Sequence, residues 1–156
     1  QLLHFIKHLN LSLMNNHINA FNIRVYALIT EGEKILISKE LIKGEIVLKF
    51  PGGGVEFGEG IIDALQREAR EEMFQELSEI EHFYTTDFFQ QSSFIESDQL
   101  ISVYYKAKLS SFLLNKVNKP KKDEPFFIWK KLEDLKAEDL HFPIDKKVLK
   151  MIQKSK

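Results

Sequence analysis

The segment from Phe50 to Gln75, FPGGGVEFGEGIIDALQREAREEMFQ, constrains the fold of this chain more than any other. A strand candidate, IVLKF, passes through three consecutive glycines and an acidic loop into a helix candidate. That helix candidate runs from Ile61 to about Leu77 without Gly or Pro, and its apolar residues recur every four positions. A strand that leads through a glycine turn into a helix indicates an α/β arrangement.

Strand candidates lie on both sides of this central helix. The β-prone series 21–29, the turn EGEK and the series KILIS predict a hairpin. We expect further strands near residues 80–89, 100–109 and 125–130, a short helix near 131–139, a final helix over 145–153 and a loop around 115–122. Strands before and after a central helix predict an α/β domain with a mixed sheet over residues 20–156.

Residues 1–19 form a separate N-terminal extension in this interpretation. Leu2, Ile6, Leu9 and Leu13 are spaced as one stripe of a helix. A packing helix is the simpler interpretation, and a helix that binds a partner is the alternative. Because the sequence begins with Gln1, we expect the true start to lie upstream.

Composition excludes several classes of protein. A length of 156 residues fits one domain, and the absence of Cys excludes disulfides, thiolate metal sites and cysteine nucleophiles. The net charge of -1 argues against duplex nucleic acid as the main partner. No apolar run approaches the roughly 18 residues of a spanning helix, so we expect a cytoplasmic protein without a membrane partner. A homodimer is left open.

Other glycine-rich motifs fit the central segment poorly. No Gly-Lys-Ser/Thr follows the glycines, which excludes a Walker loop, and the glycine spacing does not fit G-x-G-x-x-G. Dinucleotide binding of the Rossmann kind is therefore disfavoured.

The helix candidate carries three glutamates on a narrow arc. With Glu68 at 0°, Glu72 lies at about 40° and Glu71 at about -60°, beside the apolar stripe. Like charges at this spacing repel each other. Arg67 can offset one of the charges, and a hard divalent cation such as Mg²⁺ or Mn²⁺ suits the remaining carboxylate oxygens.

An acidic pair on a helix is by itself most often a solvated surface, but the wider spacing here is specific. Five residues separate a Gly from a Glu. Seven residues then separate this Glu from an Arg-Glu pair, and two more separate that pair from a Glu-Glu pair. The six positions are Gly53, Glu59, Arg67, Glu68, Glu71 and Glu72. With each residue type at about 6% abundance, chance produces this pattern on the order of once in ten million starts.

This segment resembles the Nudix box, G-x5-E-x7-R-E-U-x-E-E-x-G-U, in which U is a bulky apolar residue. The box covers Gly53 to Gln75, and a looser resemblance extends from about residue 21 to 140. Ala69 is a small occupant of its U position, Phe74 replaces the Gly, and Gln75 replaces the last U. The Gly ordinarily ends the helix in a left-handed turn. Its replacement predicts either a helix that continues toward Leu77 or a different cap.

The resemblance implies an α/β/α sandwich with a mixed sheet, and hydrolysis of a nucleoside diphosphate linked to a further group. It assigns Glu68 and Glu72 as the principal metal ligands, with the Gly52 carbonyl as a further one. Glu71 would be another ligand or a base that orients water. Arg67 would orient the acidic cluster, and Glu59 would stabilise the junction of loop and helix or hold a water on a metal.

Residues outside the box are assigned more loosely. Family members often carry a distal base shortly before a strand with a Trp, and Glu124 before Trp129 is the candidate here. Phe88 and Gln90 are candidates for stacking on a nucleobase and hydrogen-bonding it, although a strand with core phenylalanines that runs into a loop is the commoner interpretation for any one of these residues. Arg24 contacts either a phosphate or an acidic neighbour.

The leading hypothesis is therefore a Mg²⁺-dependent Nudix-type hydrolase that cleaves a diphosphate bond in a small nucleotide-like substrate. The alternative is a Nudix-like domain that binds a nucleotide metabolite without cleaving it. Isomerisation of an isoprenoid diphosphate is disfavoured, because that branch is expected to use a cysteine and this chain has none.

Overall fold

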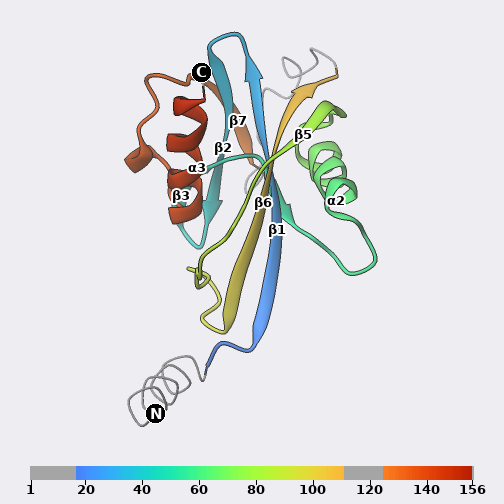
Figure 1. The fold of residues 1–156 in the computed structure, drawn as a ribbon, viewed down its shortest axis with the longest axis vertical. Coiled ribbons are helices and arrows are strands. Elements are labelled where there is room, and N and C mark those ends of the chain that lie inside the picture. The colour runs from blue at the N-terminus through green and yellow to red at the C-terminus, as the bar shows by residue number, and fades with distance from the viewer. Residues whose placement is uncertain (1–16, 111–124, 156) are drawn as a thin grey trace, which may run out of the picture.

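The computed structural model describes residues 17–110 and 125–155 (Figure 1). The predicted N-terminal extension, up to residue 16, and the predicted loop 115–122 lie outside these residues. In the described part of the chain, no helix is long and apolar enough to cross a membrane. The strands are β1 (Ala20–Glu31), β2 (Lys34–Ile42), β3 (Glu45–Lys49), β4 (Gly52–Gly54), β5 (Leu77–Thr85), β6 (Asp98–Leu109) and β7 (Phe126–Lys131).

The seven strands form one mixed sheet. The main order is β3-β2-β1-β6-β5, with β4 paired to β1 and β7 paired to β2. β1 and β6 are parallel, and the other pairs are antiparallel. β1 pairs with β2 only at Thr30 and Glu31, and earlier residues of β1 pair with β4. The glycine strand is therefore inserted where β1 and β2 separate.

Two helices cover opposite faces of the sheet, as Figure 1 shows: α2 (Ile61–Glu68) on one side and α3 (Pro143–Lys154) on the other. The strand period of two sends alternate β1 side chains to the two faces. Val25, Ala27 and Ile29 join the apolar cluster under α2, whereas Tyr26 and Leu28 join the cluster under α3. This arrangement confirms the predicted α/β/α sandwich with a mixed sheet.

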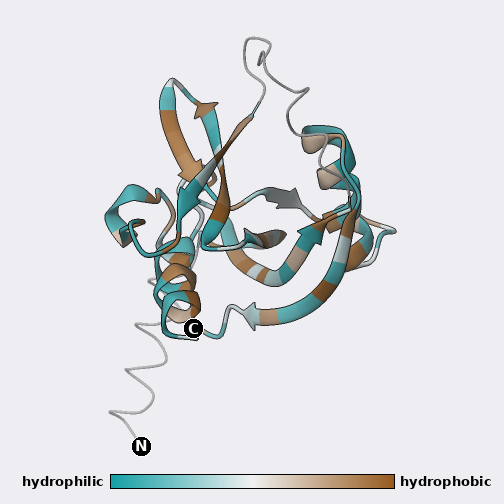
Figure 2. Ribbon diagram, turned by 90° about the horizontal axis from the view of Figure 1, so that it is seen from above, coloured by the Kyte–Doolittle hydropathy of each residue, from teal (hydrophilic) through white to brown (hydrophobic). Residues whose placement is uncertain are grey.

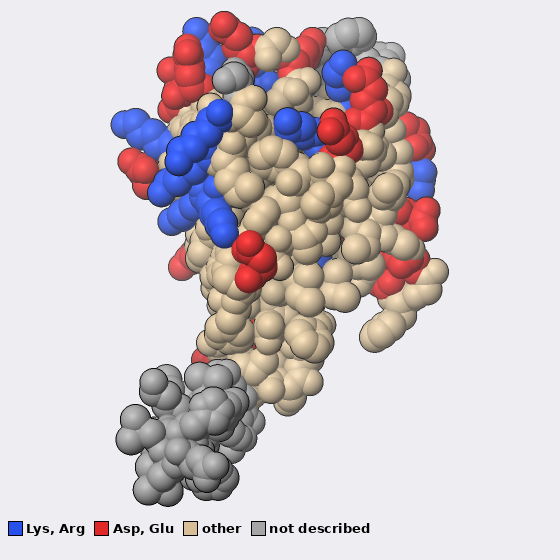
Figure 3. All heavy atoms as spheres, in the orientation of Figure 1, with Lys and Arg blue, Asp and Glu red and all other residues tan. Residues whose placement is uncertain are grey.

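Hydrophobic and hydrophilic segments alternate along the strands and around both helices (Figure 2). α3 buries Ile144, Val148, Leu149 and Ile152 on one stripe. In Figure 3, Lys and Arg atoms gather on the side of the molecule where α3 lies. The amphipathic pattern therefore places α3 on the sheet with its basic face in solvent.

The central helix ends earlier than its apolar period predicts. After α2, a π turn spans Ala69–Met73, and Phe74 adopts the left-handed conformation with φ of 55°. The Gln66 side chain then pairs with the backbone of Leu77, at 2.8 and 2.9 Å, at the start of β5. The continuation to Leu77 is thus wrong, and the different cap that we left open is present, with Phe in place of Gly.

Two other segments differ from expectation. The three glycines form β4 rather than a tight turn alone. A Cβ on Gly52 would lie 2.1 Å from the Val25 carbonyl oxygen of the neighbouring strand, so the close approach of β4 to β1 requires glycine there. The predicted helix at 131–139 is a turn followed by a 3₁₀ helix, Ala137–Asp139. The remaining strand predictions differ from the structure mainly at their ends.

Candidate active site

Arg67, in the last turn of α2, holds the acidic loop against the helix. Its Nε and Nη2 donate to Glu59 Oε2 and Oε1 at 3.0 and 2.7 Å, and Nη2 also donates to the Gly54 carbonyl at 2.9 Å. Its Nη1 donates to Glu68 Oε1 at 3.0 Å and to Glu71 Oε2 at 3.2 Å. One planar guanidinium thus fixes three carboxylates and the glycine strand, as bidentate geometry allows.

Glu59 is the principal partner of this arginine. The hydrogen bonds from Arg67, followed by one from the Glu56 backbone amide at 2.8 Å, lower the pKa of Glu59 to about 2. The hydrogen bonds with Glu59, followed by the one with Glu68, raise the pKa of Arg67. Both groups are therefore charged across the physiological range, and the junction between loop and helix is held by a permanent ion pair.

Glu68 lies directly against the glycine strand. Its side chain is 14% exposed, and a Cβ added to Gly53 would lie 2.3 Å from Glu68 Oε1. Only glycine at position 53 leaves room for this carboxylate. The first glycine of the box therefore determines where the first glutamate of the helix can lie.

Glu72 lies one turn further along the same face and interacts electrostatically with Glu68. Burial raises the pKa of Glu72 to about 7; Lys49 and Arg24 oppose the rise, and Glu40 and Glu68 add to it. A partly buried carboxylate beside two other carboxylates favours the approach of a cation. Glu68 and Glu72 therefore lie at the predicted border between the acidic arc and the apolar stripe.

Glu71 is oriented differently. Its side chain is 60% exposed and forms an ion pair with Arg67. Within residues 17–110 and 125–155, no group of three or more His, Cys, Asp or Glu side chains is arranged to hold a metal ion. The structure therefore brings Glu68 and Glu72 together and places Glu71 beside them, on the solvent side of Arg67.

A buried ion pair, which the sequence analysis did not predict, lies next to these glutamates. Lys49 Nζ lies 2.9 Å from Glu40 Oε1 and donates to the Gly52 carbonyl at 2.9 Å, and Ser38 Oγ donates to Glu40 Oε1 at 2.9 Å. Burial works to lower the pKa of Lys49, but the interactions with Glu40, Tyr26 and Glu72 together outweigh it and the pKa is raised. The signal in the sequence was a lone charge in the apolar strand IVLKF.

A cavity of about 260 Å³ opens beside this ion pair. Its wall comes from β1, β2, β3, β6, the loop after β5 and the start of α3, and its polar members include Arg24, Glu40, Lys49, Gln90 and Asp145. Of the predicted substrate residues, Arg24 and Gln90 therefore line the cavity. Phe88 is not among the lining residues and lies under Lys147, whose Nζ is 4.6 Å from the ring centroid. Glu124 lies outside the described residues.

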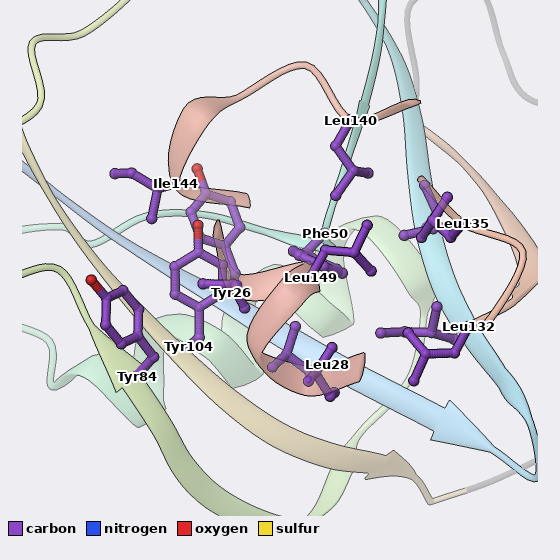
Figure 4. Close-up of a cluster of buried hydrophobic side chains, with 14 residues drawn as sticks. Tyr26, Leu28, Phe50, Tyr84, Tyr104, Leu132, Leu135, Leu140, Ile144 and Leu149 are labelled. Atoms are coloured by element: carbon purple, nitrogen blue, oxygen red, sulfur yellow. The ribbon is translucent and has the colours of Figure 1, made fainter. Parts of the chain in front are cut away.

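The inner wall of the cavity carries a buried acid and two tyrosines. Tyr104 OH donates to Asp145 Oδ1 at 2.5 Å, and the Phe50 amide donates to Asp145 Oδ2 at 3.3 Å. The rings of Tyr26 and Tyr104 lie side by side (Figure 4) and stack, and their centroids are 5.2 Å apart. Arg24 Nε donates to Tyr26 OH at 2.6 Å. These contacts fix the polar groups at one end of an otherwise largely apolar cavity.

The fold and the site define an α/β/α protein with paired glutamates on a helix that faces a glycine strand. Residues 20–152 match the family model of the NUDIX domain, and the chain therefore belongs to the NUDIX family. Family membership supports a function of the pyrophosphohydrolase type. No curated protein matches the sequence significantly.

Solved structures share this fold. A NUDIX hydrolase from Nitrosomonas europaea has a TM-score of 0.71 and 21% identity, over 86% of this chain and 90% of that one. A MutT NUDIX hydrolase from Burkholderia pseudomallei has a TM-score of 0.65 and 18% identity, over 83% and 96%. The E. coli ORF135 protein has a TM-score of 0.60 and 21% identity, over 86% and 89%. At these identities the likeness establishes the fold alone.

Proposed function

We propose that this chain is a Mg²⁺- or Mn²⁺-dependent hydrolase that cleaves a diphosphate bond in a nucleoside diphosphate linked to a further group. The observation that carries the proposal is the position of Glu68 and Glu72. Glu68 faces the glycine strand, and Glu72 interacts electrostatically with Glu68 and with Lys49, Glu40 and Arg24, which line the cavity. A small-molecule partner and a cytoplasmic location belong to the same proposal.

The donors at this site suit a hard divalent cation. Glu68, Glu72 and the Gly52 carbonyl would supply oxygen ligands, and the missing Cβ of Gly53 leaves space for the Glu68 carboxylate. A bound divalent metal polarises a phosphoryl oxygen and lowers the pKa of a water molecule.

The protein's own residues supply orientation and proton transfer. Arg67 holds Glu59, Glu68 and Glu71 in fixed relative positions through its hydrogen bonds. Glu71, which is exposed, would accept a proton from an attacking water, a role that typically contributes about 10²- to 10⁴-fold. We keep Glu124 as a candidate distal base, and Arg24, Gln90 and Phe88 as candidate substrate residues.

A panel of nucleoside diphosphate derivatives assayed with Mg²⁺ tests the proposal. We expect Glu72→Gln to lower kcat at least tenfold while folding is retained, because the amide is a poorer metal ligand than a carboxylate. Glu76→Gln is the matched control, since Glu76 is 54% exposed and pairs with Arg70 at the surface. Equal turnover in Glu72→Gln and the unaltered protein would contradict the ligand role.

Binding without cleavage is the second candidate function. It is favoured by the orientation of Glu71 toward Arg67, and because, among the described residues, no three His, Cys, Asp or Glu side chains are arranged to hold a metal ion. Tight binding of one panel member, with no cleavage of any, would select this function over hydrolysis.

A further inference from the structure

Lys49 lies between the glutamate pair, Glu68 and Glu72, and the cavity. It ends β3, its side chain is 3% exposed, and it lines the cavity while also interacting with Glu72. A buried ammonium requires compensation, because removing a charge from water is costly. Glu40, 16% exposed, provides it through the 2.9 Å ion pair.

The ammonium retains capacity for a ligand. Its three N–H donors serve Glu40 and the Gly52 carbonyl, which leaves one donor among the contacts of the described residues. Nζ also lies 5.6 Å from the centroid of the Tyr26 ring, and the Arg24 guanidinium lies 5.7 Å from the same centroid. Two cations therefore meet at one aromatic ring in the wall of the cavity.

We propose that Lys49, with Arg24 beside it, binds the phosphate group that lies between the glutamate pair and the cavity. The inference rests on the proposed function only in requiring a phosphorylated ligand. A ligand that extends from Glu72 into the cavity comes within reach of Lys49, because Lys49 lines the cavity and interacts electrostatically with Glu72. Phosphate oxygens are strong acceptors for a charged donor, and a buried phosphate needs such a partner. Glu40 pairs with the same ammonium and therefore competes with the phosphate for it.

Calorimetry with imidodiphosphate and Mg²⁺ tests this inference without any assumption about the nucleobase. We expect Lys49→Met to weaken imidodiphosphate binding at least tenfold and Lys49→Arg to stay within about threefold of the unaltered protein. Lys108→Met is the matched control, because Lys108 is 59% exposed and pairs with Glu79 at the surface. Unchanged affinity in Lys49→Met, or no binding by the unaltered protein, would overturn the inference.

Mn²⁺ binding, followed by electron paramagnetic resonance, separates ligand binding from a scaffold role. Removing a positive charge near Glu72 should leave Mn²⁺ affinity equal or higher. If Lys49→Met weakens Mn²⁺ and imidodiphosphate by the same factor, the residue only supports the fold and the inference fails. If Lys49→Met does not fold, Glu40→Gln decides: freeing the ammonium should tighten imidodiphosphate binding, and a loss would count against us.

The hydrolysis panel tests a different statement. Failure to cleave any panel member, with imidodiphosphate binding that depends on Lys49, would overturn the hydrolase proposal and leave the phosphate contact in place.

Discussion

At the scale of single residues, Asp145 shows how the fold places a charge where water cannot reach it. The carboxyl is fully buried at the start of α3 and accepts hydrogen bonds from Tyr104 and the Phe50 amide. Burial raises its pKa from 3.8 to about 6, although both hydrogen bonds oppose the rise. The folded protein therefore holds a proton on Asp145 at pH values where the unfolded chain has released it.

The sign of the resulting pH dependence follows from that difference. Between pH 4 and 6 the folded state binds one more proton than the unfolded state at this group, so stability falls as the pH rises. Over this range the free energy of unfolding falls by about 3 kcal/mol. Asp145→Asn should remove this component, because the amide can accept from Phe50 and donate to Tyr104 OH. Urea unfolding of both proteins from pH 4 to 7 measures it; parallel curves would contradict the prediction.

The residue scale also shows which parts of the site the sequence could predict. Glu68, Glu72 and Arg67 share one helix, so their spacing alone indicated a common face. Asp145 and Lys49 could not be found in this way. Asp145 accepts a hydrogen bond from Phe50, which is 95 positions away in the chain, and Lys49 pairs with Glu40 on the neighbouring strand. Such contacts depend on strand register and helix docking, which a local pattern does not contain.

At the scale of elements, the end of the central helix is the clearest departure from the sequence pattern. The apolar period continues through Met73 to Leu77, but the π turn and left-handed Phe74 redirect the chain into β5. Periodicity reports which face is buried and contains no information about the φ angle of the residue after the helix. The start of α2 at Ile61, by contrast, was predicted, because the loop before it carries the glycines.

Phe74→Gly should stabilise the protein. A left-handed conformation costs a residue with a Cβ about 1–2 kcal/mol, and the Phe74 side chain is 69% exposed, so little packing is lost. Because glycine also gains freedom in the unfolded chain, we expect a net increase of about 1 kcal/mol in the free energy of unfolding. Urea denaturation measures it.

Phe57→Gly is the matched control for this substitution. Phe57 is exposed as well but is not among the residues with positive φ, so glycine there should be neutral or destabilising. An equal gain in both variants would show that the left-handed cap is not the cause.

At the scale of the whole molecule, the sheet separates the helix that carries the proposed metal ligands from the helix that lines the proposed substrate cavity. α2 and the π turn after it carry the glutamates on one face of the sheet. On the other face, the start of α3, up to Asp145, lines the cavity. The mixed sheet was predictable from the order of strands and helices. The division was not, because it depends on β1 sending alternate side chains to two separate apolar clusters.

Two core substitutions should therefore have similar effects on stability and different effects on kinetics. Leu65 of α2 and Leu149 of α3 are both buried in the apolar clusters between helix and sheet, and truncation of either to Ala should cost about 3 kcal/mol. Leu149→Ala loosens the cavity wall and should mainly raise KM. Leu65→Ala loosens the helix that carries Glu68 and should mainly lower kcat. Steady-state kinetics on a cleaved panel member, well below the Tm of each variant, distinguishes the two. The same change in both constants would mean that the sheet transmits each defect to both faces, because its packed core responds as one unit.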